Sequence, residues 1–182
     1  MCTELQKLVR QDPNFLSRVI TGDESWLYNC DPETKQQSSQ LKTPSSPRLK
    51  KACQVRSNIK SLLIIFFYIL GIVHKEFVPP GQTVNGNFYC KVLRRLRENV
   101  RRTWPEMWKN GDWLLHHDNV PSHTSLIARE FMTKNNVTTV PHPACSPDLA
   151  PCDFCMFPKM KLQLKGWRFI SIEGSKQNHN RF

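Results

Sequence analysis

The run "SLLIIFFYILGIV", from Ser61 to Val73, is the most apolar stretch of the 182-residue chain. It has 13 residues, which is too short to span a bilayer, so buried strands are the better interpretation. Gly71 interrupts the run and predicts a hairpin of two antiparallel strands within Val55–Val78. The hairpin indicates that part of the sheet is antiparallel, and we expect no membrane partner.

Downstream of the hairpin, helical and strand patterns alternate. Residues 87–102 carry apolar side chains at helical spacing, and Pro105 ends that helix. "GDWLLHHDN" then predicts a short strand, "PSHTSLIAREFMTKNN" a helix and "VTTVPHP" another strand, and a last helix begins at about Leu149. This alternation favours a mixed α/β sheet covered by helices.

Upstream of the hairpin, residues 1–14 predict an N-terminal tail or a short helix that ends near Pro13. "FLSRVITGDESWLYNC" predicts a strand with a kink at Gly22. The polar, Pro- and Ser-rich stretch from Asp31 to Gln54 predicts a loop. Residues 1–20 have no apolar core of a secretory signal, and seven irregularly spaced cysteines indicate reduced thiols.

The charge of the chain is strongly positive. Twenty-six Lys and Arg residues face 15 Asp and Glu residues, which gives a formal charge of +11 and suits a polyanion such as nucleic acid, although a merely basic soluble protein is the alternative. The helix over 87–102 has a basic face that is a candidate for phosphate contacts, with a solvated helix surface as the alternative. Its members are Lys91, Arg94, Arg95, Arg97, Arg101 and Arg102.

Three aspartates stand at the edges of predicted core elements. Asp23 lies in the first strand, Asp118 at the end of a later strand, and Asp153 near the start of the last helix. Sites in α/β sheets are usually built at strand ends. Converging carboxylates repel one another and are stable together around cations, so we expect a site for two Mg²⁺ or Mn²⁺ ions, which would suit phosphodiester cleavage. For any single aspartate, a turn or a helix cap is the alternative.

Histidines and cysteines near these aspartates invite a zinc interpretation. His117 is adjacent to Asp118, so on a strand the two side chains point to opposite faces. His116 and His123 add no recognisable zinc spacing, and Cys152 with Cys155 form a single CxxC without a second pair. We therefore expect no zinc site here.

Three blocks carry a resemblance to a known family. "VITGDESW", "HHDNVPSH" and "SPDLAPCDF" resemble the signature blocks of the mariner branch of the Tc1/mariner DNA transposases, and 34 residues separate Asp118 from Asp153, as in mariners. The resemblance runs from about Pro13 to Ile172 and implies an RNase H-like fold over 15–172, with a mixed central β-sheet flanked by helices, followed by a divergent tail at 173–182. It implies Mg²⁺- or Mn²⁺-dependent DNA strand cleavage and transfer, a homodimer, and localisation in the nucleus. It also implies that the catalytic metal ligands are Asp23, Asp118 and Asp153.

Several features depart from the family pattern. Only 22 residues precede Asp23, which leaves no room for the two helix-turn-helix units of mariners. Val120 stands where the family has alanine, Leu41 where it has tryptophan, and an apolar "YIL" (68–70) occupies the expected tip of the hairpin. Two alternatives to an active enzyme therefore stay open: a non-catalytic DNA- or partner-binding remnant of a transposase, and a translated fossil without a selected function.

Overall fold

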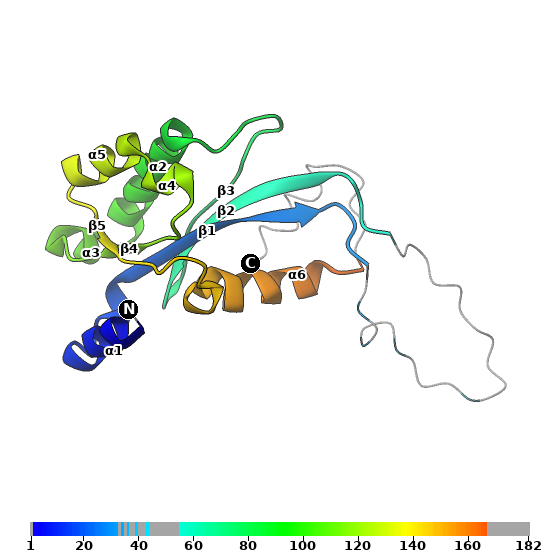
Figure 1. The fold of residues 1–182 in the computed structure, drawn as a ribbon, viewed down its shortest axis with the longest axis horizontal. Coiled ribbons are helices and arrows are strands. Elements are labelled where there is room, and N and C mark those ends of the chain that lie inside the picture. Colours follow the sequence, from blue (N-terminus) through cyan, green and yellow to red (C-terminus); the bar gives the residue numbers. More distant parts are fainter. Residues whose placement is uncertain are drawn as a thin grey trace.

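The computed structural model describes residues 2–32, 34, 36, 39, 43 and 55–166 of the chain. Its centre is a five-stranded sheet with the strand order β3-β2-β1-β4-β5 (Figure 1). The strands β1, β2 and β3 pair antiparallel, whereas β4 runs parallel to β1 and β5 parallel to β4. The sheet is mixed, as predicted. Its strands are β1 (Val19–Tyr28), β2 (Lys60–Tyr68), β3 (Gly71–Phe77), β4 (Leu114–His116) and β5 (Thr138–Val140).

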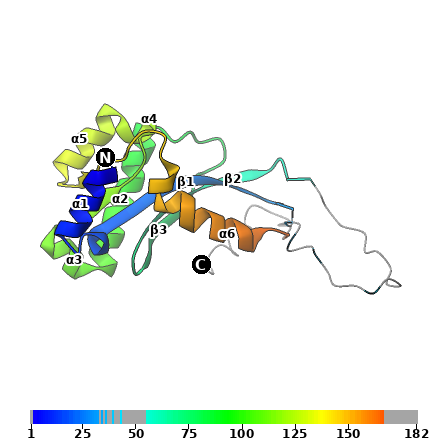
Figure 2. The ribbon, with the colours of Figure 1, turned by 60° about the horizontal axis from the view of Figure 1, so that its bottom comes forward.

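Helices cover both faces of this sheet. In both views, α6 runs beside β1, whereas α2, α3 and α5 gather towards the end of the sheet that carries β4 and β5 (Figures 1 and 2). No helix among the described residues is long and apolar enough to cross a membrane. The helices are α1 (Cys2–Gln11), α2 (Gly86–Thr103), α3 (Pro105–Asn110), α4 (Pro121–Thr124), α5 (Leu126–Lys134) and α6 (Phe157–Leu164).

The apolar hairpin supplies both halves of the core. Along β2, Ile64, Phe66 and Tyr68 belong to the core that packs against α2 and α5. Leu63 and Ile65 point the other way, into the core beneath α6. A strand that is covered on both faces has to be apolar at nearly every position, which explains the continuous run that predicted the hairpin.

The tip of the hairpin agrees with the sequence prediction only in part. Ile69 and Leu70 are 69% and 77% exposed, as expected for an apolar tip. Tyr68 is 5% exposed, however, and its ring lies edge-on to Trp104 with centroids 4.9 Å apart. The expectation of an exposed Tyr68 was wrong, because the alternation of β2 turns this side chain towards α2. Leu41 and the tail 173–182 lie outside the described residues.

The predicted kink at Gly22 is absent, because β1 is continuous from Val19 to Tyr28. Gly22 lies opposite Phe66 on β2, and a Cβ atom at this position would be 2.1 Å from Cδ1 of the Phe66 ring. The glycine is therefore required for close packing across the strand pair rather than for a bend.

The two downstream helices are more divided than predicted. Ser125 ends α4 and caps α5, since its Oγ accepts a hydrogen bond from the backbone N–H of Ala128. The last helical segment begins with a 3-10 turn at Pro147–Leu149, near the predicted start. A π-helical turn at Cys152–Met156 then leads into α6, and π turns of this kind often occur at functional sites.

Candidate active site

The three predicted aspartates come from three different elements. Asp23 lies within β1, Asp118 follows β4, and Asp153 lies in the π turn before α6. Thr21 of β1 pairs in parallel with His116 of β4. Asp23 and Asp118 each follow that pair by two residues, so the chain leaving β4 passes beside Asp23.

The pKa shifts show that the three carboxylates lie within electrostatic reach of one another. Burial raises the pKa of Asp23 to about 7, and repulsion from Asp118 and Asp153 contributes, against a hydrogen bond from the backbone N–H of Glu24. Burial, together with the charge of Asp118, also raises the pKa of Asp153. The site therefore brings together carboxylates that repel one another.

This donor set fits a hard divalent cation. Carboxylate oxygens are the ligands that Mg²⁺ and Mn²⁺ prefer. A cation would also relieve the repulsion that, in addition to burial, raises the pKa of Asp23. Within the described parts of the chain, no group of three or more His, Cys, Asp or Glu side chains is arranged so that it could hold a metal ion. The carboxylates are gathered in one region, and binding an ion would require them to close around it.

His123 was not predicted to take part in this site. Its ring is 1% exposed, with Nδ1 2.8 Å from Asp118 Oδ1 and Nε2 3.0 Å from Glu24 Oε1. Burial lowers the pKa of His123, but the two carboxylates outweigh that effect and raise it to about 9. The same contact lowers the pKa of Asp118, against the opposing effect of burial. The signal in the sequence is the histidine five residues after Asp118, in the first turn of α4.

The other two histidines of the motif lie on opposite faces of the sheet. His116 contacts Thr21 Oγ1 through Nδ1 at 3.0 Å and His142 Nδ1 through Nε2 at 3.1 Å. His117 Nδ1 lies 2.8 Å from the hydroxyl of Tyr89. Burial lowers the pKa of His116 to about 4 and that of His117 to about 3, so both rings are neutral at physiological pH.

The two cysteines around Asp153 differ in burial. Cys152 lies in the apolar core beneath α6, and burial raises the pKa of its thiol. Cys155 is partly exposed, and both residues are reduced thiols. Cys152 therefore contributes to packing behind Asp153.

The basic face of α2 has more internal partners than the sequence suggested. Arg95 forms a bidentate pair with Glu76, at 2.6 and 2.7 Å. Arg97 donates to Asn135 Oδ1 at 2.6 Å, and Arg101 pairs with an acidic residue one turn earlier on the same helix. Lys91, Arg94 and Arg102 are exposed. The role of this face in DNA binding stays a prediction. Because Arg95, Arg97 and Arg101 have partners within the protein, the better candidates for phosphate contacts are Lys91, Arg94 and Arg102.

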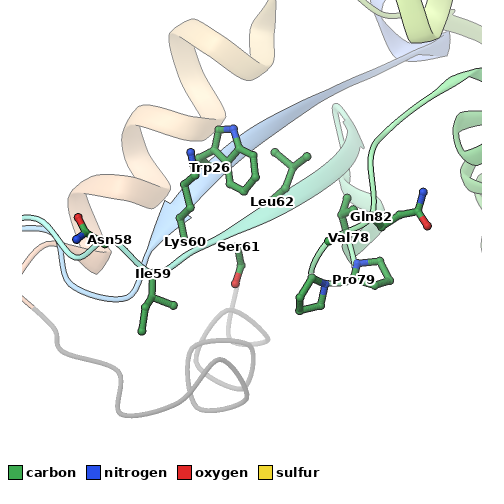
Figure 3. Close-up of a pocket in the computed structure, with 11 residues that line it drawn as sticks. Trp26, Asn58, Ile59, Lys60, Ser61, Leu62, Val78, Pro79 and Gln82 are labelled. Atoms are coloured by element: carbon green, nitrogen blue, oxygen red, sulfur yellow. The ribbon is translucent and has the colours of Figure 1, made fainter.

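A pocket of about 310 Å³ opens elsewhere, between the start of β2 and the turn that follows β3 (Figure 3). Its walls include Trp26, Lys60, Val78 and Pro79, and the ammonium group of Lys60 lies 4.2 Å from the centre of the Trp26 ring. None of the three aspartates lines it. The candidate active site is therefore the carboxylate cluster and not this pocket.

Comparisons with known proteins agree with the fold and the motifs. Residues 31–110 match the family described as transposase (partial DDE domain). The chain is 34% identical over 165 residues to the mariner Mos1 transposase of Drosophila mauritiana, an alignment that covers 90% of this chain and 47% of Mos1. It is 25% identical over 170 residues to the histone-lysine N-methyltransferase SETMAR of Homo sapiens, covering 92% of this chain and 24% of SETMAR.

Solved structures of Mos1 superpose closely. The crystal structure of the Mos1 catalytic domain has a TM-score of 0.79 at 30% identity and covers 99% of this chain, which spans 76% of that domain. The Mos1 paired-end complex with Mn has a TM-score of 0.86 at 32% identity, again over 99% of this chain and over 52% of that one. The chain thus spans about half the length of Mos1. With its RNase H-like fold, it belongs to the mariner family of DNA transposases and corresponds to their catalytic domain.

Proposed function

We propose that this domain cleaves and transfers DNA strands by divalent-metal-dependent phosphodiester chemistry. Asp23, Asp118 and Asp153 would hold Mg²⁺ or Mn²⁺ in a two-metal site. The observation that carries the proposal is that three carboxylates from separate elements lie within electrostatic reach of one another. Burial raises the pKa of Asp23 to about 7, and repulsion from Asp118 and Asp153 adds to this rise. Such a concentration of charge is costly in a merely structural cluster and suits a cation site.

The relatives support the choice of substrate and ion. Structures of Mos1 include a paired-end complex with a left transposon end and forms with Mg and with Mn. For this chain, the charge of +11 is compatible with a DNA substrate. A role in processing chromosomal DNA would place the protein in the nucleus.

The chain would position the reaction through its three elements. β1 fixes Asp23 within the sheet, the segment after β4 carries Asp118, and the π turn before α6 carries Asp153. Two bound ions would activate a water molecule and stabilise the leaving oxygen of the phosphodiester.

Nicking of supercoiled plasmid with Mn²⁺ or Mg²⁺ tests the proposal. Wild type should nick the plasmid, and Asp118→Ala should abolish nicking. Asp112→Ala is the matched control, because Asp112 precedes β4 at the end opposite Asp118. A folded wild-type domain that nicks DNA at no metal concentration would contradict the proposal.

The exposed basic residues of α2 favour a second candidate, DNA binding without catalysis. In that case, Asp118→Ala and wild type would bind DNA equally, and neither would nick it. Affinity for DNA no greater than that of a neutral control protein at physiological salt would exclude this candidate.

A further inference from the structure

Glu24 and His123 form a buried ion pair beside the candidate metal ligands. His123 Nε2 contacts Glu24 Oε1 at 3.0 Å, and its Nδ1 contacts Asp118 Oδ1 at 2.8 Å. A neutral imidazole has a single N–H group, and each of these contacts ends on a carboxylate oxygen. Both contacts are satisfied only when both ring nitrogens donate, so His123 acts as a double donor between two carboxylates.

Packing fixes the orientation of this ring. The Tyr89 ring lies 4.0 Å from the His123 ring and the His117 ring 5.0 Å from it, measured between centroids. The hydroxyl of Tyr89 is itself held by His117 Nδ1 at 2.8 Å. A fully buried ring that packs against two other rings has little rotational freedom, so its N–H groups point in defined directions.

The contact with His123 engages one oxygen of Asp118 and leaves the other available. Asp118 Oδ1 receives Nδ1–H of His123 and also, at 3.3 Å, the backbone N–H of Val120. The hydrogen bonds that Asp118 receives from described residues end on this atom alone. Oδ2 is thereby presented in a fixed orientation, as a ligand to a metal requires.

Glu24 links this arrangement to the strand that carries Asp23. Successive side chains of a strand point to opposite faces, so β1 directs Asp23 to one side and Glu24 to the other. On the Glu24 side, His123 connects β1 with the segment after β4. The connection sets the position of Asp118 relative to the strand of Asp23.

We propose that His123, anchored by Glu24, is a positioning residue that orients the Asp118 carboxylate for a divalent metal ion. The inference rests on the proposed function, in which Asp118 is a metal ligand. Outer partners of metal ligands typically contribute about 10- to 100-fold to metal affinity.

Two substitutions of His123 separate its two hydrogen bonds. The amide nitrogen of His123→Gln lies near the place of Nε2, so it still donates to Glu24 but no longer to Asp118. The amide nitrogen of His123→Asn lies near the place of Nδ1, so it still donates to Asp118 but no longer to Glu24. Glu24→Gln keeps an acceptor for Nε2–H but removes the charge.

The readout is the affinity for Mn²⁺ alone, measured by calorimetric titration of the purified chain. We expect His123→Gln to weaken Mn²⁺ binding by about 10- to 100-fold, and His123→Asn and Glu24→Gln to weaken it less. Plasmid nicking by His123→Gln should recover as Mn²⁺ is raised, whereas Asp118→Ala should not recover. Val100→Ala is the stability control, since Val100 is fully buried in the last turn of α2 and is none of the residues of the proposed site.

The outcomes distinguish this inference from the proposed function. If wild type binds Mn²⁺, Asp118→Ala does not, and folded His123→Gln binds as tightly as wild type, the positioning role is wrong and the metal site stands. If affinity follows the thermal stability of the variants, Val100→Ala included, the role of His123 is only structural. If wild type binds no Mn²⁺, the metal site itself fails. Should His123→Gln not fold, an unchanged affinity in both His123→Asn and Glu24→Gln would overturn the inference.

Discussion

Replacing Asp23 by asparagine should make the metal-free domain more stable at alkaline pH. Asp23 has an ordinary pKa of 3.8, and the folded site raises it to about 7. Between these two values the folded chain holds a proton that the unfolded chain has released. Stability therefore falls as the pH rises from about 4 to 7, and the decline is complete above pH 7.

The size of this decline follows from the pKa values. A rise from 3.8 to about 7 corresponds to on the order of 4 kcal/mol at about 1.4 kcal/mol per pH unit. This is an upper value, because solvent reaches part of the carboxylate. Asp23→Asn carries no charge at any pH, so its stability should lack this decline.

Urea unfolding in a chelating buffer, at intervals from pH 4 to pH 9, measures the effect. The free energies of unfolding of wild type and Asp23→Asn should diverge by about 2–4 kcal/mol between pH 4 and pH 8. Saturating Mn²⁺ should restore most of this stability to wild type only. Asp112→Asn is the control and should follow wild type. Parallel curves for wild type and Asp23→Asn would refute the raised pKa of Asp23, and with it the burial and carboxylate repulsion that cause it.

Three further predictions concern stabilisation by Mn²⁺, the loss of stability at acid pH through Glu76, and DNA binding by the basic face of α2. Mn²⁺ at about 100 times its dissociation constant should add about 2.7 kcal/mol to wild type and nothing to Asp118→Ala, as measured by thermal unfolding. Burial raises the pKa of Glu76, but hydrogen bonds from His74 and Arg95 outweigh burial and lower this pKa from 4.5 to about 2. The stability that the Glu76 carboxylate contributes is therefore present above pH 4.5 and is lost as the pH falls through 2. Glu76→Gln should therefore be less stable than wild type at pH 7, by about 2 kcal/mol after solvent screening, with the difference shrinking in urea titrations below pH 4. The slope of log affinity for DNA against log salt concentration should decrease by about one unit for each phosphate that a variant no longer neutralises. A triple alanine variant with an unchanged slope would exclude the basic face of α2 as a DNA contact. The residues to change together are Lys91, Arg94 and Arg102.

The pattern of the sequence was sufficient for the sheet but not for its details. A run that is apolar at almost every position, broken at Gly71, indicates strands covered on both faces, and the structure confirms this hairpin. The kink at Gly22 was predicted wrongly, because the glycine is there to leave room for the Phe66 ring on the neighbouring strand. Phe66 is far from Gly22 along the chain, beyond the reach of any local pattern.

The candidate site shows the same division between local and distant information. The positions of the aspartates in the predicted elements, together with the mariner spacing, predicted which three carboxylates form the site, and this assignment stays a prediction. The link from Glu24 through His123 to Asp118 was missed, since it joins residues 99 positions apart. A glutamate beside Asp23 and a histidine after Asp118 carry no meaning in the sequence until β1 and β4 are known to be neighbours.

The same geometry bears on Val120, which stands where the family has alanine. Valine is larger than alanine and lies two residues after Asp118, so the question is whether it displaces the carboxylate. Val120 contacts Asp118 through its backbone N–H, a group that any residue except proline supplies. Its backbone angles, φ −61° and ψ 152°, are extended, and β-branched residues adopt such a conformation readily. The carboxylate is held by this N–H and by the buried ring of His123, and neither depends on the side chain at position 120. Valine is therefore compatible with an oriented Asp118, and this substitution is no argument that the site has decayed.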